Sequence, residues 1–273
     1  MHKQQLTIIV LALGLIVGMY SLPKVIVSDK STVLAAEATA ANTVDMGAST
    51  HTNNLDAAQI AAINDLRKAY VNSADNQKKT IFADSLAGVF KSASLFDSAA
   101  HYREAIAELN PGLESWTNAG DSYYDAFGFA TDPQKANQMG EKARAFYQKV
   151  LEKDPNQLDV KANMAMTYVA SSNPMQGIAL LREVLQQDPA HERATFNMGL
   201  LSMQSGQYDK AIERFEQVLK AHPENDQAKF YLGISYAESG HGSEAKALLQ
   251  EVKKTNTDPA VQATVDEYLK KLK

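Results

Sequence analysis

The stretch that decides the fold is residues 192–225, which read ERATFNMGLLSMQSGQYDKAIERFEQVLKAHPEN. Two helices are predicted in it, over residues 194–204 and 208–219, because apolar residues recur at helical spacing on either side of a short break. Gly206 can adopt the positive φ that ends the first helix. Pro223 stops the second helix because it lacks a backbone N–H. The stretch therefore predicts a helical hairpin.

Small and aromatic residues stand at matching places in this hairpin. Gly199 and Ala211 have almost no side chain, so the two helices can approach closely at these points. Tyr208 and Phe215 lie two turns apart on one helix face and are expected to fill the space beside the small residues. One such hairpin cannot bury its own apolar face, so it needs stacked neighbours.

Prolines recur every 34 residues, at Pro155, Pro189 and Pro223, and the segments around them repeat the same order of small, aromatic and apolar residues. This spacing resembles the tetratricopeptide repeat (TPR), a helix–turn–helix unit of 34 residues. The resemblance implies an all-α fold, a TPR solenoid in which the hairpins stack into a right-handed superhelix with a terminal capping helix.

The resemblance also divides the chain into segments. An N-terminal helix is expected over 55–79, five units within 80–259 (80–112, 113–157, 158–191, 192–225 and 226–259), and a capping helix over 260–273. In the second unit Ala143 lies 23 residues after Gly120, where a regular unit has twelve. The insertion near 128–139 is expected to form a surface loop between the two helices, either functional or merely tolerated.

Residues 6–22 contain no charged side chain. This length is short for a membrane-spanning helix and slightly long for the core of a signal peptide. We expect a signal anchor over 1–27 and a flexible linker over 28–54, which together hold the repeats at a membrane, on the extracytoplasmic (periplasmic) side. Cleavage near Ala36 to Ala38, giving a secreted protein, is the alternative.

The composition argues against several classes of function. The net charge of −5 and the lack of a basic stripe speak against nucleic-acid binding. The chain has no cysteine, and its six histidines are scattered without a metal-binding spacing. We therefore expect no catalytic residue, no metal and no cofactor.

The resemblance implies that the first helix of each unit lines a concave groove. Asn118, Asn163 and Asn197 occupy the same repeat position in three units, where an amide can bind a peptide backbone or bond within the repeat. Chaperone-binding TPR domains carry a cationic clamp for a carboxylate, of which only Arg193 is present here. The candidate groove residues are Asn118, Asn163, Met166, Arg193, Phe196, Asn197, Leu200, Met203, Phe230, Tyr231 and Ile234.

Most of these groove positions are apolar, which suits a hydrophobic peptide or an amphipathic helix from a partner protein. Packing of the same side chains against neighbouring repeats is the alternative interpretation. The sequence thus predicts a non-catalytic, membrane-tethered scaffold or adaptor for protein partners, for example an envelope assembly factor. A structural subunit of a stable membrane-associated complex is the second hypothesis.

Overall fold

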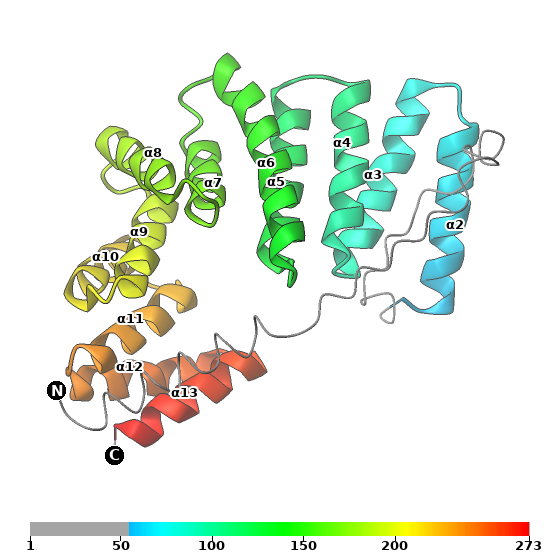
Figure 1. Ribbon diagram of the computed structural model, residues 1–273. Coiled ribbons are helices and arrows are strands. Elements are labelled where there is room, and N and C mark those ends of the chain that lie inside the picture. The colour runs from blue at the N-terminus through cyan, green and yellow to red at the C-terminus, as the bar shows by residue number, and fades with distance from the viewer. Residues whose placement is uncertain (1–54, 273) are drawn as a thin grey trace, which may run out of the picture. The chain divides into compact units, whose positions relative to one another are not determined.

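The computed structural model describes residues 55–272, which form twelve helices and no strand. The predicted all-α fold is confirmed. Consecutive helices contact each other in chain order from α2 to α13 (Figure 1). The helices are α2 (Ala57–Asn72), α3 (Asn76–Ser92), α4 (Phe96–Leu109), α5 (Leu113–Phe129), α6 (Pro133–Lys153), α7 (Leu158–Val169), α8 (Pro174–Gln187), α9 (Glu192–Gln204), α10 (Tyr208–Ala221), α11 (Asp226–Glu238), α12 (Gly242–Thr255) and α13 (Pro259–Lys271).

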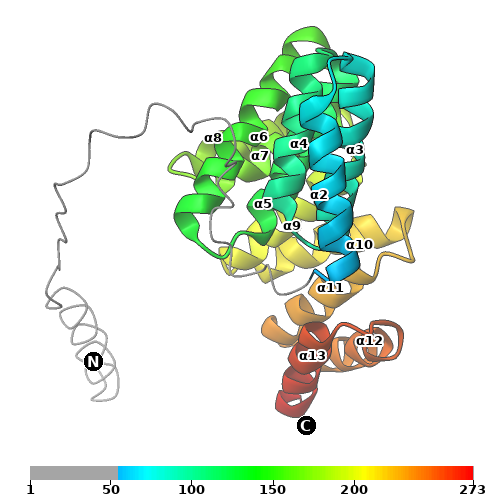
Figure 2. The same ribbon diagram turned by 90° about the vertical axis from the view of Figure 1, so that its right-hand side faces the viewer.

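The helix pairs α3–α4, α5–α6, α7–α8, α9–α10 and α11–α12 are the hairpins of the stack. In Figure 1, α2 and α3 run vertically whereas α12 and α13 run across the picture, so the direction of the hairpins changes along the stack. The rotated view places α2 to α4 side by side at one end and α12 with α13 at the other (Figure 2).

Glycine residues have the two roles in the hairpins that the sequence predicts: they end a helix, and they let two helices approach closely. Gly206 has φ 71° and Gly240 has φ 87°, and each ends the first helix of its hairpin. At Gly199, an added Cβ would lie 2.7 Å from Cε1 of Phe215, so this ring packs directly against the glycine and would have to shift for a larger residue. The buried side chains of Ala211 and Phe215 complete this contact.

The N-terminal boundary differs from the expected one. The break between α2 and α3 falls at residues 73–75, so the first helix of the first hairpin begins at Asn76 instead of residue 80. Asp75 explains the shift, because its carboxylate accepts a hydrogen bond from the backbone N–H of Gln77 at 2.8 Å and caps α3 there. The helix α2 then packs on α3 through Ile63.

Most of the insertion near 128–139 is helical, and only residues 130–132 form the predicted loop between the two helices. It lengthens both helices of its hairpin, so that α5 has 17 residues against 13 in α9, and α6 has 21 against 14 in α10. Asp132 caps α6 by accepting from the backbone N–H groups of Gln134 and Lys135, and Pro133 occupies the first turn. These are helix-start signals, and they lie inside the segment that was expected to be irregular.

Two ion pairs connect α6 of the lengthened hairpin to α4. Lys135 Nζ lies 2.6 Å from Oδ2 of Asp97, and Lys142 Nζ lies 2.8 Å from Oε2 of Glu104. The hydroxyl of Tyr123 also donates to Glu104. Burial alone would raise the pKa values of both carboxyls, but their lysine partners outweigh it, aided at Glu104 by the Tyr123 hydroxyl, and both pKa values are lowered.

These lowered pKa values predict acid sensitivity at the α4–α6 contact. A carboxyl with a lowered pKa in the folded state stabilises the fold above its unfolded pKa, and this stabilisation is lost as the pH falls through the folded value. Between pH 7 and pH 3, the melting temperature of wild type should therefore fall more steeply than that of Asp97→Asn combined with Glu104→Gln. Each partly exposed pair contributes only about 0.2–1 kcal/mol, so the difference should be a few degrees.

The matched control is Asp209→Asn combined with Glu213→Gln. Both of these carboxylates are exposed on α10, and neither has an ion-pair partner within the described part of the chain. Melting followed by circular dichroism across this pH range is the measurement. Parallel curves for wild type and the Asp97–Glu104 variant would contradict the prediction.

The C-terminal helix α13 covers the last hairpin. Asp258 caps it by accepting from the backbone N–H groups of Ala260 and Val261, with Pro259 at the first position. Val265 is fully buried against Leu249 and Val252 of α12. The apolar stripe of α13 thus covers the exposed apolar face that a stack of hairpins leaves at its end.

The predicted signal anchor (1–27) and linker (28–54) lie outside the described residues. Within residues 55–272, no helix is both long enough and apolar enough to cross a bilayer. The membrane tether therefore stays a prediction.

Candidate functional site

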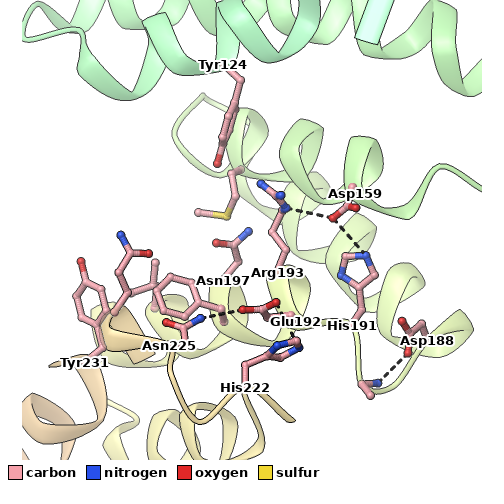
Figure 3. A pocket seen from close by; sticks show the side chains of 15 residues that line it. Tyr124, Asp159, Asp188, His191, Glu192, Arg193, Asn197, His222, Asn225 and Tyr231 are labelled. Carbon is pink, nitrogen blue, oxygen red and sulfur yellow. Dashed lines mark hydrogen bonds and ion pairs between the residues drawn. The ribbon is translucent and has the colours of Figure 1, made fainter. Parts of the chain in front are cut away.

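A cavity of about 810 Å³ lies along the last three hairpins, between α7, α9 and α11 (Figure 3). Tyr124 of α5 and the loops before α9 and α11 complete its wall. The lining residues are Tyr124, Asp159, Met166, Asp188, Ala190, His191, Glu192, Arg193, Phe196, Asn197, Leu200, His222, Asn225, Gln227 and Tyr231. Ligand cavities in proteins commonly measure about 300–1,000 Å³, so this one can hold several residues of a polypeptide.

One side of the cavity is apolar and aromatic. Phe196 contacts Tyr231 edge to face, with ring centroids 5.7 Å apart, and also contacts the buried ring of Phe215 at 5.5 Å. Met166 and Leu200, one repeat apart on α7 and α9, extend this side. Helix packing fixes the aromatic rings from behind, so this surface is formed before any ligand arrives.

The other side is polar and consists mainly of ion pairs. Arg193 Nε donates to Oδ1 of Asp159 at 3.2 Å, and His191 Nε2 lies 3.7 Å from the same oxygen. On the next repeat, Asn225 donates through Nδ2 to Glu192 Oε1 at 2.8 Å. His191 and Asn225 also cap α9 and α11, accepting from Ala194 N and Ala228 N. Helix capping therefore fixes the position of this polar side.

The amide of Asn163 is fully used inside the stack. It donates through Nδ2 to Asp121 Oδ1 at 3.2 Å and accepts through Oδ1 from Arg193 Nη1 at 3.1 Å. The Tyr147 hydroxyl donates to the same Asp121 oxygen at 2.7 Å, and burial together with this carboxylate raises the pKa of Tyr147. The resulting chain of hydrogen bonds joins the second, third and fourth hairpins.

The amide of Asn197, one repeat later, has no such partners. Its side chain is buried, with the residue 7% exposed, and no group among residues 55–272 forms a hydrogen bond with its Nδ2. The reason is a difference one repeat earlier, because Met166 occupies the position that Asp121 holds for Asn163. We call this group the open amide of Asn197. It belongs to the wall of the cavity.

Comparison with known proteins relates part of the chain to a repeat family. Residues 136–195 and 202–266 match the tetratricopeptide repeat family. Within these two stretches, the chain is similar to tetratricopeptide repeats. The fold is similar to that of a TPR protein from Parabacteroides merdae ATCC 43184, with a TM-score of 0.56 at 15% identity over 78% of this chain and 82% of that one.

A second solved structure, that of a thermophilic TPR protein from Thermus thermophilus, has a TM-score of 0.53 at 17% identity over 70% of this chain and 98% of that one. At such identities the similarity concerns the fold. A comparison with curated proteins gave no match. The predicted TPR solenoid is thus confirmed.

The cavity between α7, α9 and α11 is lined by six of the eleven candidate residues. These are Met166, Arg193, Phe196, Asn197, Leu200 and Tyr231. Asn163 is buried and bonds within the stack. Asn118 lines a separate cavity of about 590 Å³ between α3, α4 and α5.

The remaining candidates lie away from the lining of the larger cavity. Ile234 is buried in α11, and Phe230 packs toward α12 and α13. Met203 is half-buried beside Phe215. Substitution of Ile234 would therefore disturb the core, whereas substitution of Leu200 would alter the cavity.

The sequence analysis missed the lining residues that precede the first helix of each TPR unit. The predicted positions lie within, or directly before, the first helix of each unit, whereas His191, His222 and Asn225 belong to the connecting loops. A signal was present, since His191 and Asn225 stand one repeat apart at the N-cap of their helices. Among the described residues, no cluster of histidine and carboxylate side chains could hold a metal ion.

Proposed function

We propose that this protein is a non-catalytic adaptor that holds a segment of a partner protein in the cavity of its third to fifth TPR units. The observation that carries the proposal is the open amide of Asn197. A buried N–H without an acceptor is unfavourable by about 1–3 kcal/mol. The Nδ2 atom itself is covered in the unliganded structure, so a carbonyl oxygen from a ligand removes that penalty once the amide turns toward the cavity. In a polypeptide, such carbonyls occur at every residue.

The same amide favours an extended segment over a helix. Within a helical ligand, backbone carbonyls are already bonded, except for the last four. An extended segment presents an unbonded carbonyl along with side chains that alternate in direction. One side chain could then lie on the surface of Phe196, Leu200 and Met166 while the backbone accepts from Asn197. Tyr124 lines the cavity, and its hydroxyl can donate as well. Burial raises the pKa of this hydroxyl further above its ordinary value.

Site-specific photocrosslinking tests this proposal. The probe is p-benzoylphenylalanine at Gln227, which is exposed and lines the cavity. The control places the same probe at Lys246, which is exposed on α12 away from the cavity. In cells that produce the full-length chain, a defined partner should crosslink from position 227 and not from 246, and Asn197→Leu should strongly reduce the product.

Two other results would change the conclusion. Equal crosslinking from both positions would show that the cavity is not the contact site. A partner that stays attached through detergent and high salt would favour the second hypothesis, a structural subunit of a stable complex.

We further propose that residues 6–22 tether the TPR array to a membrane, with the array on the extracytoplasmic side. The uncharged run supports this, and the Ala-, Thr- and Ser-rich segment after it suits a linker. Flotation of membranes on a density gradient should carry the full-length chain upward and leave behind a variant without residues 6–22. Protease added outside spheroplasts should then digest the tethered array. Flotation of both forms, or of neither, would contradict the tether.

A further inference from the structure

The cavity carries an excess of negative charge. Three carboxylates line it, from Asp159, Asp188 and Glu192, but only one guanidinium, that of Arg193. Its two histidines carry charge only when protonated. With both histidines neutral, the lining therefore has two more negative than positive charges.

The single positive charge is also engaged. Arg193 donates through Nε to Asp159 at 3.2 Å and through Nη1 to Asn163 at 3.1 Å. Asp159 therefore neutralises much of the Arg193 charge. The side chain of Arg193 is 49% exposed and that of Asp159 is 69% exposed. The two remaining carboxylates, Asp188 and Glu192, have no such cationic partner within residues 55–272 when the histidines are neutral.

Glu192 is held in place by its neighbours. Its Oε1 accepts from Asn225 Nδ2 at 2.8 Å, and its Oε2 lies 3.3 Å from His222 Nε2. Asp188 is fixed similarly, since its Oδ1 accepts from the backbone N–H of Ala190 at 3.0 Å. A carboxylate has about four acceptor sites, so both groups can accept a further donor from a ligand.

We propose that the cavity selects an extended segment in which a basic side chain neighbours an apolar one. This inference rests on the proposed function, and it names the chemistry of the ligand. The apolar residue lies against Phe196 and Leu200, a backbone carbonyl accepts from the open amide of Asn197, and the lysine or arginine pairs with Glu192 or Asp188. An acidic segment is disfavoured because it would meet uncompensated carboxylates.

The spacing within the site supports a single ligand that makes all three contacts. Glu192, Phe196 and Asn197 lie within two turns of α9, so a few residues of an extended chain span them. In Figure 3, Glu192 lies near His222 and Asn225, toward the loop that precedes α11, and Asn197 lies on the other side of Glu192. The basic and apolar side chains of the ligand therefore belong to nearby residues.

A peptide array tests the inference. The peptides are nonapeptides with a central leucine, acetylated at the N-terminus and amidated at the C-terminus. Lysine, glutamine or glutamate is placed in turn at each of the other positions. The protein is the full-length chain in mild detergent at pH 8. The dissociation constants of the best peptides are measured by fluorescence anisotropy.

Lysine peptides should bind roughly three- to tenfold tighter than their glutamine versions, because a partly exposed ion pair is worth about 1 kcal/mol. Glutamate peptides should bind more weakly than both.

Glu192→Gln and Asp188→Asn should each reduce the preference for lysine over glutamine, and the double variant should reduce it to less than about twofold. Glu213→Gln is the control, because it removes one exposed carboxylate from α10 outside the cavity. The lysine preference should also shrink at high salt, since salt screens exposed charges.

The outcomes separate the two proposals. If leucine-centred peptides bind through Asn197 with no preference for charge, the basic ligand is refuted and the adaptor function stands. If glutamate peptides bind best, the inference has the wrong sign and is refuted. If no peptide binds, or if binding is unchanged in Asn197→Leu, both proposals fall.

Discussion

Replacement of Gly177 by alanine is expected to lower the melting temperature more than any other single added methyl group in this array. An added Cβ would lie 2.4 Å from the carbonyl oxygen of Ala165 and 2.9 Å from the backbone nitrogen of Val169. These are backbone atoms of α7, which cannot turn aside as a flexible side chain can. Overpacking typically destabilises by about 1–3 kcal/mol, which corresponds to a drop of roughly 3–10 °C for a chain of this length.

Two other glycines provide the matched comparison. At Gly88, an added Cβ meets nothing within 4 Å, so alanine should stabilise the fold by about 0.5–1 kcal/mol through its better helix propensity and raise the melting temperature. At Gly199, the obstacle is the ring of Phe215, a side chain that can shift. We therefore expect stability to rank Gly88→Ala above wild type, then Gly199→Ala, then Gly177→Ala. Circular dichroism melting measures the ranking, and an unchanged Gly177→Ala would mean that α7 and α8 are not in close contact.

The glycine contacts illustrate what the sequence could predict. The contact between Gly199 and Phe215 joins two residues of one hairpin, so the spacing of small and aromatic residues was enough to find it. The helical insertion was also within reach, since Asp132 and Pro133 form the same start signal as Asp258 and Pro259. The prediction of a loop follows instead from the general rule that insertions in solenoids map to loops.

The polar half of the site could not be predicted in the same way. Whether a groove asparagine is free depends on a side chain one repeat earlier, and Asn163 reaches Asp121 across 42 residues that include the insertion. Three asparagines at one repeat position therefore look equivalent in the sequence. The structure separates them, because Asp121 satisfies Asn163 whereas Met166 leaves Asn197 open.

This difference predicts opposite effects of the same substitution at the two asparagines. Asn163→Leu leaves Asp121 and Arg193 without one of their partners, which should destabilise the fold by about 1–3 kcal/mol. Asn197→Leu removes a buried amide that has no partner in the described region and replaces it with an apolar group of similar shape. The unliganded protein should therefore gain stability, by about 1 kcal/mol or roughly 2–4 °C.

Peptide binding should respond in the opposite way, with Asn197→Leu as the variant that is impaired. Asn197→Leu should weaken binding about tenfold, because the ligand carbonyl loses its donor and the new methyl groups occupy its place. Asn163→Leu should bind nearly as well as wild type at a temperature well below its own melting point, because its amide is used inside the stack. The measurement pairs melting curves with anisotropy titrations on the two purified variants. If both variants lose stability, the Asn197 amide must already have a partner, and the cavity then lacks the donor on which binding depends. If Asn197→Leu is more stable and yet binds normally, the amide is only a packing defect of the repeat, and the ligand lies elsewhere on the array.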